Sequence, residues 1–439
     1  MKRSIVFVSL LFVLCVSMVF AGGRSQSQQT AGGKVVFWDT MTGLQGECIQ
    51  RIVDAYNATN PAVQVERTVV VPSSTSDSSQ LLTAVRSGTG PDVYYMNRPF
   101  ATQRAGDGAL EDITSYLAKI DPNIAGKYMD FAWKEVQYKG KTYGLPFDTD
   151  SRALFYNKTL LREAGVDPAI LDPANGPITL AQLKEIAFKV NQKDAQGRYT
   201  RVGFIPTYSQ GWLFTWGFIY GGSFVDINAN KITATDPKIV SALTWMKDWF
   251  RDMGPMDVQN FLSTYEPPNN PPQQSPFYLE KIAMFIGGDW ELASLAEYAP
   301  NLDYGYTYIP VPNRGDKSTT WAAGFSMVVP TGSKRIEAAV RFMTYACGAE
   351  GQKRYTVETT HLPTYRTIME DSGNFDTGHQ FFRTLMNNAT SLPSQVPVNV
   401  QLWDAMAQAQ YEATIEQKDP LTVLREAENK VQADYNQYR

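Results

Sequence analysis

Lys34-Val35-Val36-Phe37-Trp38 begins the alternation of strands and helices that indicates the class of fold. This short apolar run is flanked by glycines and a turn, which predicts a buried strand. Downstream, apolar residues at helical spacing occupy 44–56, a β-branched segment follows at 63–71, a second helix is expected at 80–86, and a third strand at 92–96. Strand, helix, strand, helix, strand is typical of a parallel α/β sheet.

Two loops follow the first and third predicted strands, at residues 39–43 and 96–98. In parallel α/β sheets, ligands bind beyond the carboxyl ends of the strands. We therefore expect these loops to form one wall of a ligand site. Asp39, Glu47 and Asn97 are candidate ligand contacts from this loop position alone.

The middle of the chain repeats the pattern. A strand is expected at 153–156, and Thr179 is a candidate N-cap for a helix. An apolar strand at 282–286 leads into Gly287-Gly288-Asp289-Trp290. From Ser333 onward the chain is expected to be mainly helical.

The N-terminus predicts export. Two basic residues precede an uncharged apolar run over 5–20, which ends in a small-residue cleavage pattern, so residues 1–21 are expected to be a signal peptide. Residues 22–33, rich in Gly, Ser and Gln, are expected to be a flexible tether. Cys15 is an alternative lipidation site, but it lies inside the apolar run and follows a leucine. We expect a periplasmic or otherwise extracytoplasmic location.

Length, charge and cysteine content narrow the classes of function. The roughly 400 residues after the tether are too many for one hydrophobic core and predict two lobes. The net charge of −4 gives nucleic acid no electrostatic reason to bind. Cys48 lies on an apolar helical stripe and is expected to be a buried thiol. Export permits a disulfide, so whether Cys48 pairs with Cys347 is left open.

Catalytic and metal-binding motifs are absent from the sequence. Its two histidines, His361 and His379, are far apart, and no His-Glu-x-x-His, Cys-x-x-Cys or phosphate-binding Gly-Lys loop occurs. We expect no catalytic residue, no metal and no cofactor. The alternative from another class is an exported carbohydrate-active enzyme that uses Asp148 or Asp150, since glycosidases need paired carboxyl groups.

A set of short motifs occurs in order along the chain: Val36-Phe37-Trp38, Asn60-Pro61, Ser87-Gly88-Thr89-Gly90-Pro91-Asp92-Val93, Gly140-Lys141-Thr142-Tyr143-Gly144-Leu145-Pro146, Leu154-Phe155-Tyr156-Asn157-Lys158, Gly288-Asp289-Trp290, Tyr308-Ile309-Pro310 and Leu362-Pro363. These motifs resemble the family 1 extracellular solute-binding proteins of ABC importers, the group that contains maltose-binding protein. Their order and spacing over residues 34 to about 435 make the set specific.

The resemblance implies a two-lobe α/β clamp of the type II periplasmic-binding-protein class. Its chain would cross the hinge three times, near Pro146, Ile282 and Thr331. The segments of the first and second lobe would be 34–146 with 283–331, and 147–282 with 332–439, respectively. The protein would be a monomer that captures a small-molecule ligand, a mono- or oligosaccharide, and delivers it to ABC permease subunits in the membrane.

The resemblance also matches five residues to the ligand cleft. Trp290 matches a tryptophan that stacks on sugar, and Asp150 lies where a ligand-contacting glutamate occurs. Trp321 and Gly324 match a cleft-lining strand, and Trp212 lies near an aromatic contact. An aromatic ring packs on the C–H face of a pyranose, and carboxylates accept hydrogen bonds from its hydroxyls. We expect Trp290 and Trp321 to supply the faces, and Asp150 with Asp39 and Asn97 to supply the polar edge.

One departure concerns Met96-Asn97-Arg98, where maltose-binding protein has Trp-Ala-His-Asp-Arg after its third strand. The ligand is therefore not expected to be bound as maltose is. Arg98 and Arg152 keep a sugar acid or a polyol phosphate open as alternative ligands, since guanidinium groups suit carboxylates and phosphates. Arg152 is expected to form a salt bridge, and His361 to be a structural residue.

Overall fold

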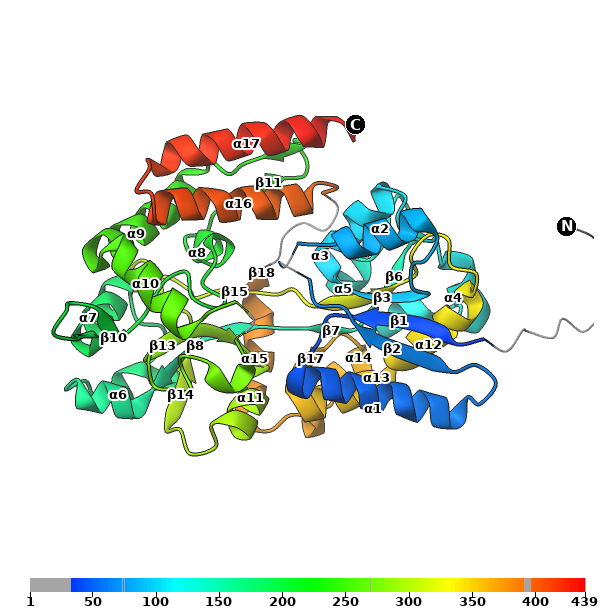
Figure 1. Cartoon of the computed structure of the whole chain (residues 1–439), viewed down its shortest axis with the longest axis horizontal. Coiled ribbons are helices and arrows are strands. Elements are labelled where there is room, and N and C mark those ends of the chain that lie inside the picture. The colour runs from blue at the N-terminus through cyan, green and yellow to red at the C-terminus, as the bar shows by residue number, and fades with distance from the viewer. Residues whose placement is uncertain (1–32, 73, 75, 269, 391–395, 439) are drawn as a thin grey trace, which may run out of the picture. The chain divides into compact units, whose positions relative to one another are not determined.

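The computed structural model describes residues 33–72, 74, 76–268, 270–390 and 396–438. The expected signal peptide and tether, with Cys15, lie outside the described residues except for Gly33. The compact unit Lys34–Arg439 consists of two lobes, each with its own sheet and hydrophobic core (Figure 1). Within the described residues, no helix is both long and apolar enough to cross a membrane.

The first lobe contains a five-stranded sheet in the order β2-β1-β3-β16-β6. Its strands are β1 (Val35–Asp39), β2 (Val65–Val69), β3 (Val93–Asn97), β6 (Gly144–Pro146) and β16 (Phe325–Val328). β1 pairs in parallel with β2 and β3, which confirms the predicted parallel arrangement. β16 joins antiparallel between β3 and β6, so a distant segment completes this sheet.

Helices surround this sheet. They are α1 (Gly43–Thr59), α2 (Ser79–Ser87), α3 (Arg98–Gly106), α4 (Thr114–Ile120), α5 (Asp130–Lys134), α12 (Ile336–Ala346), α13 (Ala349–Thr359) and α14 (Arg366–Glu370). Of these, α1 and α2 lie near the predicted 44–56 and 80–86, whereas α3, α4 and α5 were not predicted. Gly88 ends α2 at a φ of 72°, a left-handed conformation that glycine adopts without strain. Cys48 and Cys347 are both buried in this core as free thiols, so they form no disulfide.

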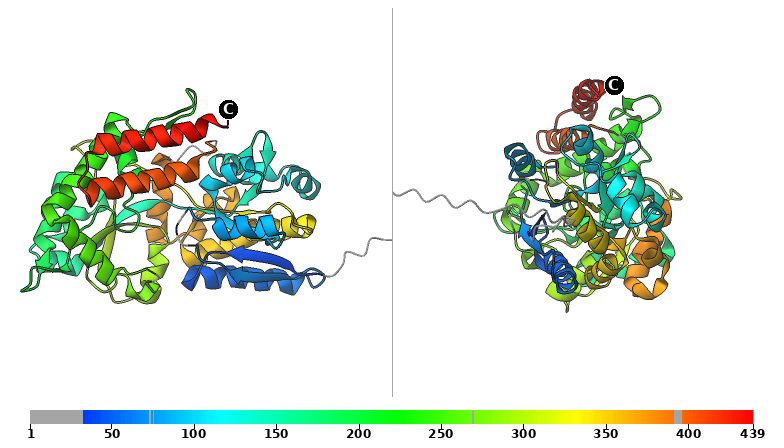
Figure 2. Two further views of the ribbon diagram at one scale, coloured as in Figure 1. Left: turned by 45° about the horizontal axis from the view of Figure 1, so that its top comes forward. Right: turned by 90° about the vertical axis from the view of Figure 1, so that its right-hand side faces the viewer.

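The second lobe contains an antiparallel sheet in the order β13-β8-β14. Its strands are β8 (Arg152–Asn157), β13 (Met284–Gly288) and β14 (Tyr304–Thr307). Its helices are α6 (Lys158–Glu163), α7 (Leu180–Val190), α8 (Leu213–Ile219), α9 (Pro237–Met253), α10 (Pro255–Tyr265), α11 (Glu291–Tyr298), α15 (Thr377–Leu385), α16 (Asn399–Thr414) and α17 (Pro420–Asn436). α16 and α17 lie side by side (Figure 2).

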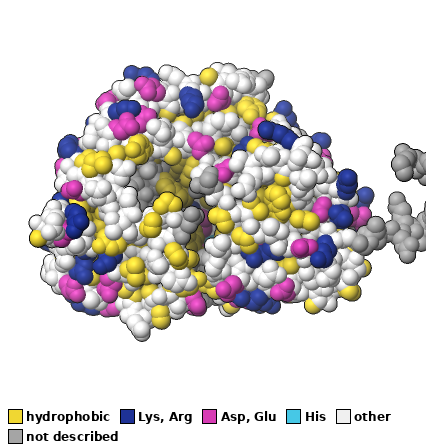
Figure 3. Space-filling view, in the orientation of Figure 1, with side chains coloured by type: hydrophobic (Ala, Val, Ile, Leu, Met, Phe, Trp, Pro, Cys, Tyr) yellow, Lys and Arg dark blue, Asp and Glu magenta, His cyan; other side chains and the backbone are white. Residues whose placement is uncertain are grey.

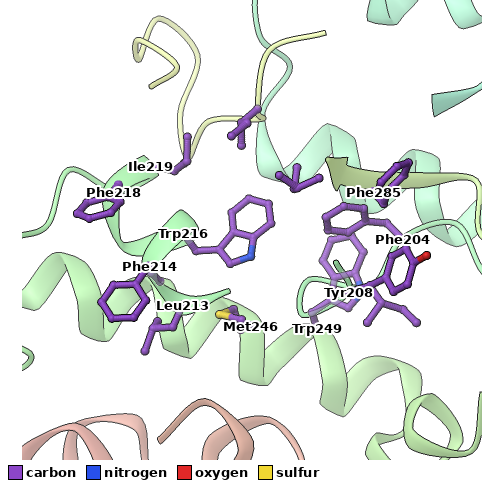
Figure 4. Packing of buried hydrophobic residues seen from close by; sticks show 14 of the residues in the cluster. Phe204, Tyr208, Leu213, Phe214, Trp216, Phe218, Ile219, Met246, Trp249 and Phe285 are labelled. Atoms are coloured by element: carbon purple, nitrogen blue, oxygen red, sulfur yellow. The ribbon is translucent and has the colours of Figure 1, made fainter. Parts of the chain in front are cut away.

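Many aromatic side chains pack in the core of the second lobe (Figure 4). The ring centroid of Phe204 lies 6.0 Å from that of Trp216 and 5.5 Å from that of Trp249. At the edge of this core, Thr179 caps α7 in a capping box with Gln182, which confirms the predicted N-cap.

Short strands complete the structure. They are β4 (Gln137–Tyr138), β5 (Lys141–Thr142), β7 (Asp148–Thr149), β9 (Gln192–Lys193), β10 (Tyr199–Arg201), β11 (Val225–Asp226), β12 (Lys231–Ile232), β15 (Thr320–Trp321), β17 (Leu362–Pro363) and β18 (Ala389–Thr390). β7 pairs with β17 where the chain leaves the first lobe, and β15 pairs with β18.

The segments are divided between the lobes differently from the expected 283–331 and 332–439. β13 and β14 belong to the second lobe, because both pair with β8. α12 and α13 belong to the first lobe, because both pack against α1. Ile282 is not a crossing, since it is fully buried in the second core. The chain crosses at 148–151, at 321–324 and between α14 and α15.

Candidate ligand-binding site

A cavity of about 600 Å³ lies between the two lobes, where Figure 3 shows the surface hollowed. This volume falls within the range of about 300–1,000 Å³ that is usual for small-molecule sites. The first lobe lines it with the loop before α1, the end of β3 and the start of α3. The second lobe lines it with residues at the ends of β8, β13 and β15 and at the starts of α8 and α16.

Asp150 and Arg152 form a buried ion pair in the cavity wall. Arg152 Nη1 lies 2.6 Å from Asp150 Oδ1, and both side chains line the cavity. Arg152 Nε also donates to Gln210 Oε1 (3.0 Å), and Asp150 Oδ1 accepts a bond from the Ala323 N–H (2.8 Å). The expected salt bridge of Arg152 is confirmed, and its partner Asp150 is held by several groups of the protein.

Trp321 lines the cavity, but its ring is largely covered. The Arg152 guanidinium carbon lies 3.6 Å from the Trp321 ring centroid, and the indole N–H donates to Thr215 Oγ1 (2.9 Å). Only 3% of Trp321 is exposed. Trp321 therefore positions Arg152 and has no open face for stacking, which differs from the role expected for it.

Trp212 and Trp403 line the cavity together with Phe100. The Trp403 ring centroid lies 4.8 Å from that of Trp212 and 6.3 Å from that of Phe100. Phe100 comes from α3 of the first lobe, so this aromatic surface is built by both lobes. Trp403 was not predicted from the sequence, because an aromatic residue inside a long helix ordinarily predicts core packing.

Trp290 lies at the start of α11 and also lines the cavity. Its ring stacks on the imidazole of His361, with centroids 5.5 Å apart and an interplanar angle of 21°. Gly288 makes room for the ring, since a Cβ there would lie 2.0 Å from it. Burial lowers the pKa of His361 to about 4, so a neutral imidazole supports Trp290 at neutral pH.

Two first-lobe candidates, Asp39 and Glu47, lie outside the cavity lining. The Asp39 carboxylate is fully buried and pairs with Arg67 of the neighbouring strand. Glu47 extends along α1 towards Arg51, at 3.8 Å, with its side chain largely exposed. Both acids thus have protein partners away from the cavity, which corrects the expectation based on loop position.

Asn97 and Gly324 do line the cavity, at the end of β3 and just before β16. Gly324 has a φ of 123°, and a Cβ there would lie 2.4 Å from the carbonyl oxygen of Asp148. A glycine is therefore required where the chain returns to the first lobe.

Arg98 and Asp148 are buried beside the cavity and do not line it. Arg98 pairs with Glu135 and donates to the backbone carbonyls of Asp148 and Ala323. The Asp148 carboxyl accepts a bond from the Phe325 N–H (2.6 Å), and burial raises its pKa to about 7. Both acids of the enzyme alternative, Asp148 and Asp150, are thus bound by protein groups, whereas a glycosidase needs two carboxyl groups flanking the substrate bond.

The arrangement of two lobes around this cavity has counterparts among known proteins. A family model described as bacterial extracellular solute-binding protein matches residues 51–383. The chain belongs to this family. A curated relative of this solute-binding protein, the maltotriose-binding protein of Pyrococcus abyssi, is 24% identical over 361 residues, which cover 79% of this chain and 70% of the relative.

Solved structures similar to this solute-binding protein confirm the two-lobe fold. CpMnBP1 with mannobiose bound has a TM-score of 0.81 at 24% identity, covering 91% of this chain and 99% of that chain. The GacH receptor of Streptomyces glaucescens, solved unliganded and with acarbose, has a TM-score of 0.75 at 22% identity, covering 92% and 99%. Within the described residues of this chain, no group of three or more His, Cys, Asp or Glu side chains is placed to hold a metal ion.

Proposed function

We propose that this solute-binding protein captures a neutral carbohydrate between its lobes and presents it to an ABC importer, without catalysing a reaction. The observation that carries the proposal is the composition of the cavity wall, which combines several tryptophans with one charge-balanced ion pair. Aromatic rings suit the C–H faces of sugars, and fixed polar groups suit their hydroxyls. The names of the similar proteins, which refer to maltotriose, mannobiose and acarbose, support this ligand class.

The charge of the wall favours a neutral sugar over a sugar acid or a polyol phosphate. Among side chains, an anion is bound best by a cation whose charge is not already balanced. Arg152 is the only cationic residue among the lining residues that the structure describes, and Asp150 balances it at 2.6 Å. Arg98, the other arginine considered for an acidic ligand, is fully buried outside the cavity.

The mechanism is closure of a clamp. A ligand that contacts both walls at once binds only the closed arrangement, so binding shifts the population towards it. The closed monomer would then dock on the membrane permease subunits of the importer. Residues 1–21 would direct export, and cleavage after Ala21 would leave the protein outside the cytoplasm.

A thermal-shift screen of residues 22–439 tests the proposal against neutral mono- and oligosaccharides, sugar acids and polyol phosphates. A neutral sugar at a hundredfold excess over its Kd should add about 2.7 kcal/mol of stability. Calorimetry should then show the Kd rise by about 30-fold in Trp212→Ala, because buried aromatic contacts dominate binding energies.

Trp245→Ala is the matched control. Trp245 is half-buried against Trp216 in the same lobe and does not line the cavity, so its loss should cost stability and leave the Kd unchanged. The proposal fails if only acids or phosphates raise the melting temperature. It also fails if the sugar is recovered chemically altered.

A further inference from the structure

Two helices from different lobes meet beside the cavity. α16 belongs to the second lobe and touches α3 of the first. Asn399 Nδ2 donates to the carbonyl oxygen of Pro99 (3.0 Å), and the Val400 N–H donates to Gln103 Oε1 (2.9 Å). These bonds join the first turn of α16 to α3 on the cavity side of both helices, where Pro99 itself lines the cavity.

Two further hydrogen bonds extend this contact. Ser76 Oγ donates to Asp404 Oδ1 (2.5 Å), one turn along α16 from Asn399. The Tyr438 hydroxyl, just after α17, donates to Asp107 Oδ1 (2.8 Å) at the end of α3. The second lobe therefore bonds to α3 at its start through Pro99, at its middle through Gln103 and at its end through Asp107. Ser76 adds a bond from the segment before α2.

The polar groups at the centre of this contact are buried. Asn399 is 0% exposed and Gln103 is 2% exposed, although both are amides that would be hydrated if the lobes separated. Buried amides are found almost always with hydrogen-bond partners, because an unpaired one is costly. Neither side chain lines the cavity, so neither needs to contact a ligand to make these bonds.

Each side of the contact is fixed to its own lobe. Val398 and Leu402, which flank Asn399, are fully buried in the second core. Ala101 and Ala105 of α3 pack in a core cluster with residues of β3 and β16. Because packed helices move as units with their cores, an opening of the cleft that separates α16 from α3 breaks the hydrogen bonds between them.

We propose that the contact between α16 and α3 is a latch that holds the lobes together without a ligand. Asn399 and Gln103 are positioning residues, which act on the ligand only through closure. The apparent Kd equals the intrinsic Kd divided by the fraction of protein in the closed form. The latch raises that fraction, so it strengthens the binding of every ligand by the same factor, whereas Trp212 affects each ligand differently.

The test uses Asn399→Ala, Gln103→Ala and the double variant in residues 22–439. Spin labels at the exposed positions Ser115→Cys in α4 and Ala181→Cys in α7 report the separation of the lobes, because the native thiols are buried. Asn157→Ala is the matched control, since fully buried Asn157 Nδ2 donates to Glu280 Oε2 (3.1 Å) within the second lobe, away from the crossings and the cavity.

Without ligand, the double variant should lose the short label-to-label distance that the parent shows, and the control should keep it. With saturating ligand, all variants should show the closed distance. The Kd should rise about 5-fold for each single variant, by an equal factor for every ligand tested. A ligand-free parent that is already open would overturn the latch, as would a change in Kd that varies between ligands.

Only the affinity test of the latch rests on the proposed function, because it needs a carbohydrate that binds. The distance measurement without ligand needs no sugar and decides the latch by itself. If no carbohydrate binds the parent, the proposed function fails while the latch is still decided by the label distances.

Discussion

The two walls of the cavity differ in the chemistry that they offer. The first lobe contributes the loop residues 40–42 and the strand end 94–97, which carry no charge, with Asp77 as its single acid. The second lobe contributes the ion pair of Asp150 and Arg152 and all four tryptophans among the described lining residues. The residue types that determine the class of ligand are therefore concentrated in the second lobe, and the first lobe closes over them.

The helix N-termini at the cavity differ from several others, since α1 of the first lobe and α8, α11 and α16 of the second have no side-chain cap. Side chains cap several helices of the second lobe: Asn157 for α6, Thr179 for α7, Asp236 for α9 and Asp419 for α17. α1, which begins at the cavity, has no side-chain cap on Thr42. The first N–H groups of a helix lack partners within the helix. At the start of α1, these N–H groups can therefore donate to solvent or to the hydroxyls of a ligand.

The largest expected effects come from one buried ion pair in each lobe. Arg152→Met leaves Asp150 unpaired in the second lobe, and Arg98→Met leaves Glu135 unpaired in the first. Each substitution should lower the free energy of unfolding, measured in urea, by about 3–5 kcal/mol, because it leaves an uncompensated buried charge.

Only Arg152→Met should also weaken sugar binding, measured by calorimetry, since Arg98 does not line the cavity. Arg152→Lys is the control that keeps the charge but changes the geometry of its hydrogen bonds. Equal losses of sugar affinity in Arg152→Met and Arg98→Met would contradict the assignment of the charged ligand-binding groups to the second lobe.

Two buried groups near the hinge should have opposite effects on stability as the pH changes. Burial raises the pKa of Asp148 from 3.8 to about 7, so the stability that it contributes is present at low pH and lost as the pH rises through this window. Burial lowers the pKa of His361 from 6.5 to about 4, so its contribution is present above 6.5 and lost as the pH falls towards 4.

Single substitutions should separate these opposing effects. Relative to the parent, the stability of Asp148→Asn should rise with pH between 4 and 6.5, and that of His361→Gln should fall, each by on the order of 2 kcal/mol. Urea denaturation at several pH values measures both slopes, and groups left unchanged cancel in the subtraction. Parallel slopes for parent and variants would show that neither group titrates differently on unfolding.

Strands β1, β2 and β3 of the first lobe could be predicted from the sequence, because their signals are local. The strand at β1 and the helix end at Gly88 depend on neighbouring residues alone. The lobe assignment of β13 could not be predicted this way, because it depends on pairing with β8, which lies far away in the chain. The buried ion pair of Asp39 could not be predicted either, because its partner Arg67 comes from the adjacent strand.

The candidate site was predicted only in part, for a similar reason. Asp150, Trp212, Trp290 and Gly324 lie at the cavity, as the matched motifs implied. The covered face of Trp321 depends on a guanidinium that packs across it, which sequence spacing does not encode. Short motifs identify loops that approach a cleft, whereas the partner of each side chain is set by the tertiary structure.

The smallest expected effect concerns the helix caps and tests whether a helix N-terminus at the cavity differs from one away from it. Thr179→Ala removes a capping box and should lower the free energy of unfolding by about 1 kcal/mol, with no change in sugar affinity. Thr42→Ala should change stability by less than about 0.5 kcal/mol, since Thr42 makes no capping bond. Because Thr42 lines the cavity, its substitution should instead alter the Kd. If Thr42→Ala cost as much stability as Thr179→Ala, the start of α1 would already be satisfied by the protein, and its N–H groups would not be available to a ligand.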